Sequence, residues 1–337
     1  MKISRLGEQG LLERLQRFCP QEIIGDDAAV LETSPGQQLV VTTDMLVDGV
    51  HFSDRTTPPE AAGWRAAAAN LSDLAAMGAA PLGITVGLGI AGDTPVDWVE
   101  RLYQGMTDCL QQYNTYIIGG DIVRSPVITL AITACGQVST KATIRRNAAQ
   151  PGNAIVVTGV HGASRAGLEL LLHPELGHQL TSAERDFFIN AHQRPKPRLD
   201  ILPTLWEILD TQSQIRVAGM DSSDGLADAI VQICRASHVS AKITREKIPL
   251  PAALTQLVSP QQAVSWALYG GEDFELLLCL PTKTAQLLVK QLGQGAAIIG
   301  EIQSRCQDSL APSLVYTDKT SPDEVLSLSQ GFQHFRD

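Results

Sequence analysis

Residues 57–90 read TPPEAAGWRAAAANLSDLAAMGAAPLGITVGLGI, a helix pattern followed directly by a strand pattern. Thr57 can cap the helix, Pro58 suits its first turn, and Gly78 can end it. The alanines between 60 and 77 allow the helix to pack closely on a sheet, and residues 82–90 supply one strand of that sheet. The stretch therefore predicts a mixed α/β fold.

Helix and strand patterns continue on both sides of this stretch. A helix is expected near 8–18, short strands at 28–32 and 38–44, and a second helix capped by Thr94 that runs to Tyr113. Further strands are expected at 115–120, 126–138, 154–160, 215–220, 239–244, 274–280 and 296–302. Helices are expected near 163–172, 182–192 and 199–210, and another begins after the motif at 221–225.

The length of 337 residues predicts two domains, because single cores rarely grow beyond about 250–300 residues. The stretch 139–153 is polar and is interrupted by Pro151 and Gly152, which is typical of a connector. We therefore expect domains at 1–140 and 150–337.

The amino-acid composition and net charge argue against some classes of binding partner. The chain has 44% hydrophobic and 18% charged residues, a net charge of −10 and no basic run, so we expect no nucleic acid partner. It has no apolar run long enough for a membrane span and starts without a secretory pattern, which favours the cytoplasm. Its six cysteines are spread without a CxxC motif, which argues against a zinc site or redox pair.

Seven aspartates lie where apolar stretches end or are interrupted: Asp26, Asp27, Asp44, Asp73, Asp121, Asp221 and Asp224. Two unit charges about 5 Å apart repel by roughly 3 kcal/mol at an effective dielectric near 20, so carboxylates gathered by a fold need a cation. Oxygen ligands without nearby Cys or His favour a hard ion such as Mg²⁺ together with nucleotide phosphates.

Asp73 gives the sharpest argument among these acids. It lies in the second half of a helix, where the dipole disfavours negative charge. Asp44 and Asp121 each end an apolar strand, where ligands gather in α/β folds. For Asp44 or Asp121 taken alone, a turn-initiating role is the more common explanation, and the acids of GDDAAV and MDSSDG could form an Asx turn and a helix N-cap. Taken together, the sites are poorly explained by turns.

Common nucleotide-binding motifs do not explain the chain. Gly87, Gly89 and Gly92 form a GxGxxG, but the stretch that follows is helical where a dinucleotide fold needs a second strand. There is no P-loop, HRD, DFG, GxSxG or HExxH sequence.

The set GDDAAV (25–30), TTDMLVDGVHF (42–52), NLSDLAAMGA (70–79), IIGGD (117–121), SSDG (222–225) and GGEDFE (270–275) resembles the thiamine-monophosphate kinases of the aminoimidazole ribonucleotide synthetase superfamily. The resemblance spans nearly the whole chain. It implies a two-domain PurM-like fold, with an ATP-binding N-terminal domain that dimerises through its strands and a C-terminal α/β domain.

The resemblance also implies three groups of site residues. It implies metal ligands at Asp27, Thr42, Thr43, Asp44, Asp73, Asp121, Asp221 and Asp224. It implies ATP contacts at Tyr103, Gly120, Asp121, Arg146 and Ser223, with Arg145 as the alternative to Arg146. Substrate contacts are implied at His51, Glu272 and Phe332.

The implied reaction converts ATP and thiamine monophosphate to ADP and thiamine diphosphate in a homodimer, with several Mg²⁺ ions and K⁺ as a further cation to be tested. No side chain is implied as a catalytic acid or base, because the acceptor phosphate is already ionised near pH 7. Three alternatives stay open at this point: another synthetase of the superfamily, a regulator that binds nucleotide without consuming it, and a structural acidic protein.

Overall fold

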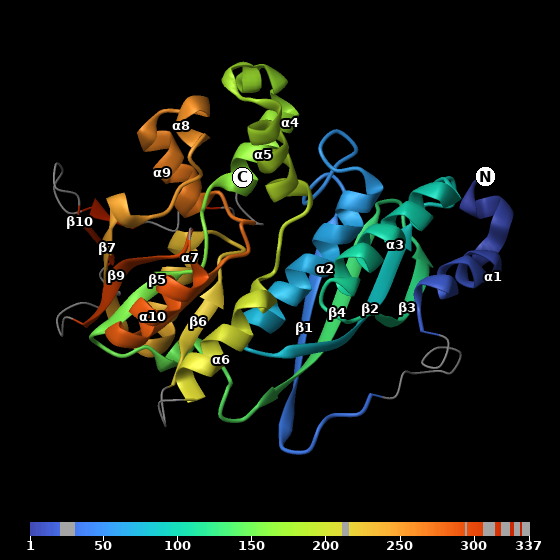
Figure 1. Cartoon of the computed structure of the whole chain (residues 1–337). Coiled ribbons are helices and arrows are strands. Elements are labelled where there is room, and N and C mark those ends of the chain that lie inside the picture. The colour runs from blue at the N-terminus through green and yellow to red at the C-terminus, as the bar shows by residue number, and fades with distance from the viewer. Residues whose placement is uncertain are drawn as a thin grey trace. The chain divides into compact units, whose positions relative to one another are not determined.

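The structure is a computed structural model that describes residues 1–20, 31–210, 216–293, 295–305, 314–317, 324–326 and 331. The chain divides into two compact units (Figure 1). The first unit comprises residues 1–74 and 79–141, and the second comprises 75–78 and 142–337. The mixed α/β class expected from residues 57–90 is confirmed.

The first unit is built on a four-stranded sheet in the order β1-β4-β2-β3. Its strands are β1 (Gln37–Val47), β2 (Ala80–Ile90), β3 (Ile117–Arg124) and β4 (Thr129–Ser139). β4 pairs antiparallel with both β1 and β2, whereas β2 and β3 are parallel.

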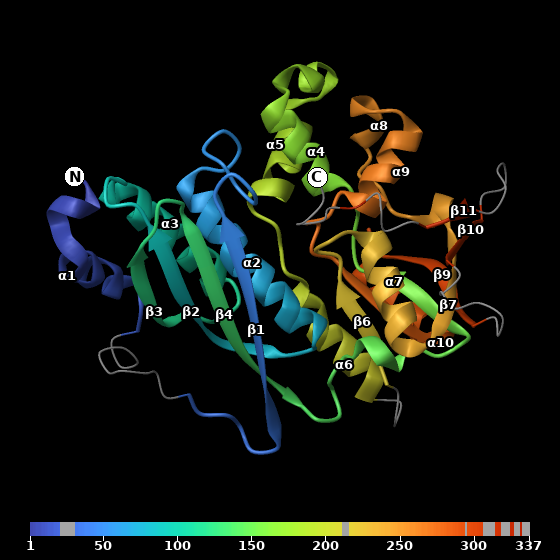
Figure 2. The same ribbon diagram turned by 180° about the vertical axis from the view of Figure 1, so that it is seen from behind.

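Helices α2 (Pro59–Ala76) and α3 (Val96–Gln111) cover one face of this sheet (Figures 1 and 2). Alternate residues of β4 are buried, as expected for a strand with one covered face. The opposite face carries exposed apolar side chains, including Leu39, Val41, Met45 and Val123, each 54–56% exposed.

Helix α1 (Ile3–Leu15) and the short helix η1 (Gln16–Phe18) precede the sheet. The sequence predicted this helix only from about residue 8. An additional turn precedes it, in which Ser4 and Ile3 donate backbone hydrogen bonds to Gly92 and Thr94 at 2.7 and 3.1 Å. Gly7 has a non-helical φ of 77°, so the uninterrupted helix begins near residue 8, as predicted. Thr94 does not cap α3, whose N-cap residue is Pro95, so that prediction was wrong by one residue.

The second unit contains a seven-stranded sheet in the order β11-β10-β7-β9-β5-β8-β6. Its strands are β5 (Asn153–Val157), β6 (Ala218–Asp221), β7 (Val239–Thr244), β8 (Leu276–Pro281), β9 (Ala297–Ser304), β10 (Leu314–Thr317) and β11 (Glu324–Val325). Its α-helices are α4 (Ala163–Leu172), α5 (Ser182–Gln193), α6 (Leu202–Asp210), α7 (Leu226–Ser237), α8 (Leu254–Leu257), α9 (Pro260–Tyr269) and α10 (Thr282–Leu292). Short 3₁₀ helices lie at Arg146–Ala148, Pro174–Gln179, Arg198–Ile201 and Arg245–Lys247.

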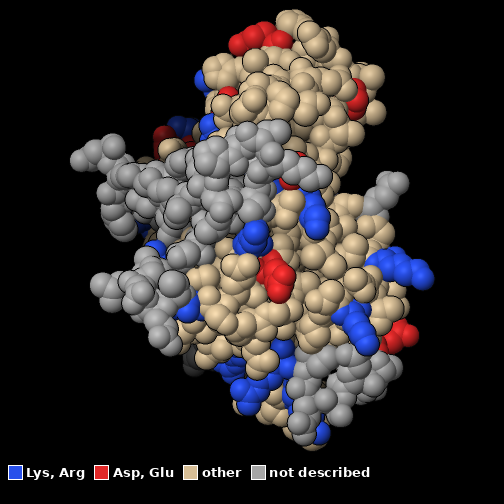
Figure 3. Space-filling model, turned by 90° about the vertical axis from the view of Figure 1, so that its left-hand side faces the viewer, with Lys and Arg blue, Asp and Glu red and all other residues tan. Residues whose placement is uncertain are grey.

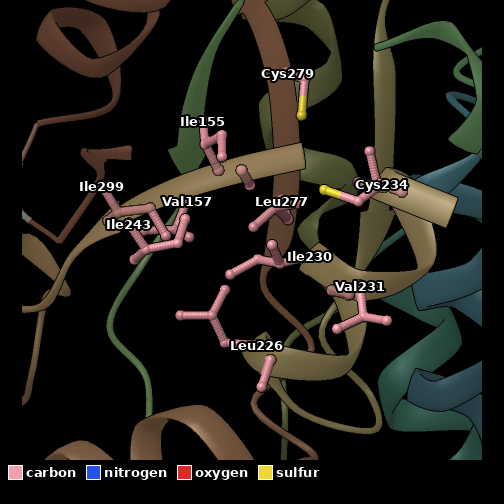
Figure 4. Packing of buried hydrophobic residues seen from close by; sticks show 14 of the residues in the cluster. Ile155, Val157, Leu226, Ile230, Val231, Cys234, Ile243, Leu277, Cys279 and Ile299 are labelled. Atoms are coloured by element: carbon pink, nitrogen blue, oxygen red, sulfur yellow. The ribbon is translucent and has the colours of Figure 1, made fainter. Parts of the chain in front are cut away.

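Strands β5, β6 and β8 of this sheet are buried on both faces. Ile155 and Leu277 pack with Leu226 and Ile230 of α7 (Figure 4), whereas Val156 and Leu278 pack on the side of α6 and α10. Strands buried on both faces are almost wholly apolar, which is why β8 reads LLLCLP. A separate cluster joins α4, α5, α8 and α9.

The charged surface residues and the cysteines are spread over the molecule. In Figure 3, basic and acidic side chains lie between wide uncharged areas. Among the described helices, none combines the length and hydropathy that crossing a membrane requires. Cys109, Cys234 and Cys279 are buried and free, as expected for small core residues, while Cys306 lies outside the described residues. The strand predicted at 28–32 also lies largely outside them.

Candidate functional site

Strand β1 and helix α2 bring three of the expected ligands to one side of the first sheet. Thr42 and Asp44 alternate with exposed residues on β1 and are half-buried, so both face the helix-covered side. Thr42 Oγ1 donates a hydrogen bond to Asp73 Oδ2, which joins the strand to the last turn of α2. The acid that the helix dipole disfavours is therefore held by a hydroxyl from the sheet.

The register places Thr43 and Asp121 differently. Asp44 lies in one row with Ile132, Val86 and Gly120, whereas Asp121 lies in the next row with Gly87, Ala131 and Met45. Because neighbouring rows point to opposite faces, the side chain of Asp121 belongs to the face that α2 does not cover.

Thr43 lies on that same uncovered face. Its Oγ1 donates to Ile132 O at 2.8 Å and accepts from Thr133 Oγ1 at 3.3 Å. The structure therefore groups Thr42, Asp44 and Asp73, and does not bring the side chains of Thr43 and Asp121 to them. The metal roles of Thr43 and Asp121 stay predictions.

Gly120 is required by the close approach of β3 to β2. A Cβ atom at this position would lie 2.3 Å from the carbonyl oxygen of Val86, closer than any real contact allows. The glycine thus lets an exposed stretch of backbone lie beside Asp121, where a backbone N–H can serve a ligand. Its role as an ATP contact stays a prediction.

His51 follows β1 in a tight turn. Its Nδ1 accepts a hydrogen bond from Val47 N at 3.0 Å, and its carbonyl oxygen accepts one from Nη2 of the buried Arg65 at 3.3 Å. Because Nδ1 uses its lone pair on a backbone N–H, the neutral ring carries its proton on Nε2. His51 is therefore arranged to present a donor nitrogen.

Tyr103 is in a different environment. It is 5% exposed on α3, its ring lies 5.8 Å from that of Phe18, and burial raises the pKa of its hydroxyl. These observations give Tyr103 a packing role, and its expected contact with ATP stays a prediction.

In the second unit, the loop after β6 carries the other expected metal ligands. Asp221 ends β6 and is 2% exposed, while Asp224 is exposed. Ser223 Oγ donates to Asp221 Oδ1 at 3.1 Å. Gly225 closes the loop with a φ of 106°, a conformation that other residues rarely adopt.

The loop at 270–275 is hydrogen-bonded directly to the loop after β6. Glu272 N donates to Ser223 O at 2.7 Å, and Ser222 N donates to Glu275 O at 2.9 Å. Glu272 and Phe274 have φ values of 59° and 52°, which are uncommon for residues other than glycine. Strained backbone of this kind persists where surrounding structure holds it, often at functional sites.

Arg146 lies near these loops. Its carbonyl oxygen accepts from Ser237 Oγ of α7 at 2.8 Å. Burial raises the pKa of Asp228 and nearby Asp224 raises it further, whereas Arg146 is among the groups that lower it. Arg146 and Asp224 thus both act on Asp228. Which of Arg145 and Arg146 contacts ATP stays a prediction.

Sequence reasoning did not single out Asp228, His192 or Arg198. Asp228 follows Asp224 by four residues at the start of a predicted helix, a spacing that could have identified it. His192 and Arg198 lie in a stretch without a recognised motif.

The oxygen donors of the described residues suit a hard metal ion for which the protein supplies only some of the ligands. All are carboxylate or hydroxyl oxygens, and no three described His, Cys, Asp or Glu side chains lie close enough together to hold a metal ion. Mg²⁺ commonly takes one or two carboxylates and completes its shell with water and phosphate oxygens. The residues therefore suit ions that arrive with a nucleotide. The predicted ligand Asp27 and the predicted substrate contact Phe332 lie outside the described residues.

Comparisons with known proteins identify the family to which the chain belongs. A family model described as AIR synthase related protein, N-terminal domain, matches residues 25–138, and its C-terminal counterpart matches residues 150–311. The thiamine-monophosphate kinase of Synechococcus elongatus is 54% identical over 335 residues, which cover 99% of this chain and 98% of that protein.

Solved structures show the same relationship. The thiamine-monophosphate kinase of Stenotrophomonas maltophilia K279a has a TM-score of 0.76 and 32% identity, covering 90% of this chain and 95% of that one. AaThiL complexed with AMPPCP and TMP has a TM-score of 0.70 and 30% identity, covering 96% and 98%. The chain therefore belongs to the AIR synthase related family and, within it, to the thiamine-monophosphate kinases.

Proposed function

We propose that this chain transfers the γ-phosphoryl group of ATP to the phosphate of thiamine monophosphate, giving ADP and thiamine diphosphate as the last step of thiamine diphosphate biosynthesis. Its relatives carry the name of this activity, and a neighbouring structure holds AMPPCP and TMP. The observation that carries the proposal is the hydrogen bond from Glu272 N to Ser223 O. This bond joins Glu272, the expected contact of the acceptor substrate, to the loop after β6 that carries the expected ATP and metal residues.

The acceptor phosphate needs no strong base. Its second pKa near 6 leaves it mostly ionised at pH 7, so a phosphate oxygen attacks the γ-phosphorus directly and ADP leaves in line, without a phosphoenzyme. The protein's task is then to position two polyanions and offset their repulsion.

Several of this chain's oxygens would hold the cations. In the first unit these are Thr42, Asp44 and Asp73, and in the second Asp221 and Asp224. When bound, Mg²⁺ supplies charge neutralisation at the phosphates. The proposal includes Asp27, Thr43 and Asp121 as further ligands and assigns no residue to K⁺.

Each unit has donor or acceptor groups that suit one of the two substrates. The planar guanidinium of Arg146 suits two phosphate oxygens of ATP. Nε2 of His51 suits a phosphate or ring acceptor of thiamine monophosphate, and the carboxylate of Glu272 suits its cationic thiazolium or amino group. Phe332 and Gly120 complete the proposed contacts.

We also propose that the enzyme is a cytoplasmic homodimer. The uncovered face of the first sheet carries exposed Leu39, Val41, Met45 and Val123, an apolar surface of the kind that a second copy covers. All described cysteines are free, which suits a reducing compartment.

The test is to incubate the purified chain with ATP, Mg²⁺ and thiamine monophosphate and to separate the products by chromatography. We expect equal amounts of ADP and thiamine diphosphate, with turnover lowered by orders of magnitude in Asp44→Asn and unchanged in Asp93→Asn, which replaces an exposed acid of the same unit. Product from an aminoimidazole precursor instead, or near-normal turnover in Asp44→Asn, would contradict the proposal.

A further inference from the structure

The carboxylate of Glu272 projects from a loop whose backbone has an uncommon conformation. Gly271, Glu272 and Phe274 all have positive φ values, of 69°, 59° and 52°. A Cβ at Gly271 would lie 2.8 Å from Ser223 O, so the loop is also closely packed on its neighbour. The Glu272 side chain thus leaves a closely packed loop of uncommon backbone conformation, of the kind that surrounding structure holds in place.

The stretch 192–198, which reads HQRPKPR, contacts this loop at two of its residues. Near its start, His192 Nδ1 lies 3.7 Å from Glu272 Oε2. At its end, Arg198 Nη1 donates to Glu275 Oε2 and to Thr158 O. One segment of chain thus reaches both glutamates of the GGEDFE motif.

His192 is itself firmly held. It lies in the last turn of α5 and is 3% exposed, and its Nδ1 lies 3.4 Å from Ser164 Oγ on α4. The backbone N–H of Ser164 in turn donates to Asp273 Oδ1 at 2.9 Å. The last turn of a helix favours donors and positive charge, so the ring is well placed to face a carboxylate.

The two side chains differ sharply in exposure. The Glu272 side chain is 35% exposed, so it can reach a ligand, whereas His192 is enclosed by α4 and α5 and cannot. His192 therefore acts on a ligand only through Glu272. A buried ring behind a half-exposed carboxylate fixes which way that carboxylate points.

We propose that His192, held by Ser164, is a positioning residue that orients the Glu272 carboxylate toward the thiamine moiety of the acceptor substrate. This inference rests on the proposed function. It predicts that His192 sets affinity for thiamine monophosphate and leaves affinity for ATP unchanged.

The experiment measures KM and kcat for both substrates in five variants of the full chain. His192→Leu removes the ring nitrogens, and His192→Asn keeps an amide donor near the position of Nδ1. Glu272→Gln and the double variant His192→Leu/Glu272→Gln complete a double-mutant cycle. The control His173→Asn removes the ring of an exposed His–Glu pair with a similar separation, 3.5 Å.

We expect His192→Leu to raise the KM for thiamine monophosphate about tenfold, with the KM for ATP within about twofold of wild type. His192→Asn recovers most of the loss, and His173→Asn changes nothing. In the Glu272→Gln background, His192→Leu adds no further loss. Thermal unfolding of each variant separates a folding defect, which lowers the melting temperature, from a binding defect, which leaves it unchanged.

Three results would overturn the inference. Additive losses in the double variant show that His192 does not act through Glu272. An equal rise in both KM values shows a general structural role, and an unchanged KM in Glu272→Gln shows that this carboxylate does not contact the acceptor. In all three cases wild-type turnover still supports the proposed function, whereas wild-type protein that forms no thiamine diphosphate refutes the function and the inference together.

Discussion

Replacing Arg198 with methionine would leave the buried carboxylate of Glu275 without its cation. Nη1 of Arg198 donates to Glu275 Oε2 at 2.5 Å and to Thr158 O at 2.8 Å. The two charged side chains are 16% and 15% exposed. Burial raises the pKa of Glu275, and Arg198 is the main group that opposes this rise.

The cost follows from these contacts. Removing one partner of a buried ion pair costs about 3–5 kcal/mol of unfolding free energy. Because both side chains keep some exposure, we expect the lower end, about 3 kcal/mol. The second interaction of Arg198, with Asp200, adds little, since Asp200 is 61% exposed and well screened.

The loss should depend on pH. Without Arg198 the pKa of Glu275 in the folded state rises further. A carboxyl with a raised folded-state pKa contributes stability at low pH, and this contribution is lost as the pH rises through that pKa. The destabilisation should therefore be larger at pH 8, where Glu275 must ionise, than at pH 5, where it can retain its proton.

Urea denaturation of Arg198→Met at both pH values measures this difference. The control is Arg165→Met, which breaks a 2.6 Å pair with Glu169 in which the arginine is 41% exposed, and should cost about 0.5 kcal/mol or less. A loss below about 1 kcal/mol at pH 8, or the same loss at both pH values, would refute the reasoning.

Three further outcomes are expected. Asp73→Asn should lower turnover at least about a hundredfold with little change in the melting temperature, because Thr42 can still donate to the amide oxygen; normal turnover would remove Asp73 from the site. Burial raises the pKa of Asp273 to about 7, so its contribution to stability is present below about pH 4 and is lost as the pH rises through about 7. Asp273→Asn should therefore gain stability relative to wild type between pH 5 and 8, by at most about 1.4 kcal/mol per pH unit, and a flat difference in denaturation midpoints would contradict this. Val41→Lys should shift the chain from dimer to monomer in light scattering, since Val41 is 56% exposed on an apolar face; a dimer that persists would place the interface elsewhere.

The parts of the fold that the sequence predicted best are those set by local pattern. The alanine-rich helix and the strand that follows it are present, because periodicity acts within a few residues. The helix begins at Pro59, so the cap predicted at Thr57 was wrong by one residue. The resemblance located Asp44 and Asp73, which do lie on one side of the first sheet. The turn of α1 before Gly7 could not be predicted, since its first N–H groups are satisfied by distant Gly92 and Thr94.

The parts that could not be predicted depend on register and burial. The face of Asp121 follows from the pairing of β3 with β2, which includes an irregularity between Ile84 and Thr85 that no local pattern reveals. Which face Thr43 shares with it follows from the register of β1 with β4. Similarly, nothing in the sequence near His192 shows that it is buried beside a glutamate 80 residues away. Such contacts arise from tertiary packing.

The strand order of the first sheet has a consequence for synthesis on the ribosome. β1, which carries Thr42 and Asp44, is made first, yet its partner in this sheet is β4, whose residues follow about 80–100 positions later. At about 5–20 residues per second, the nascent strand waits roughly 4–20 s for that partner. β4 then enters between β1 and β2, so the sheet cannot be completed strand by strand from its N-terminus. During this interval Leu39, Val41 and Met45 are exposed on a strand without backbone partners in its sheet, a stage at which a chaperone would be of most use.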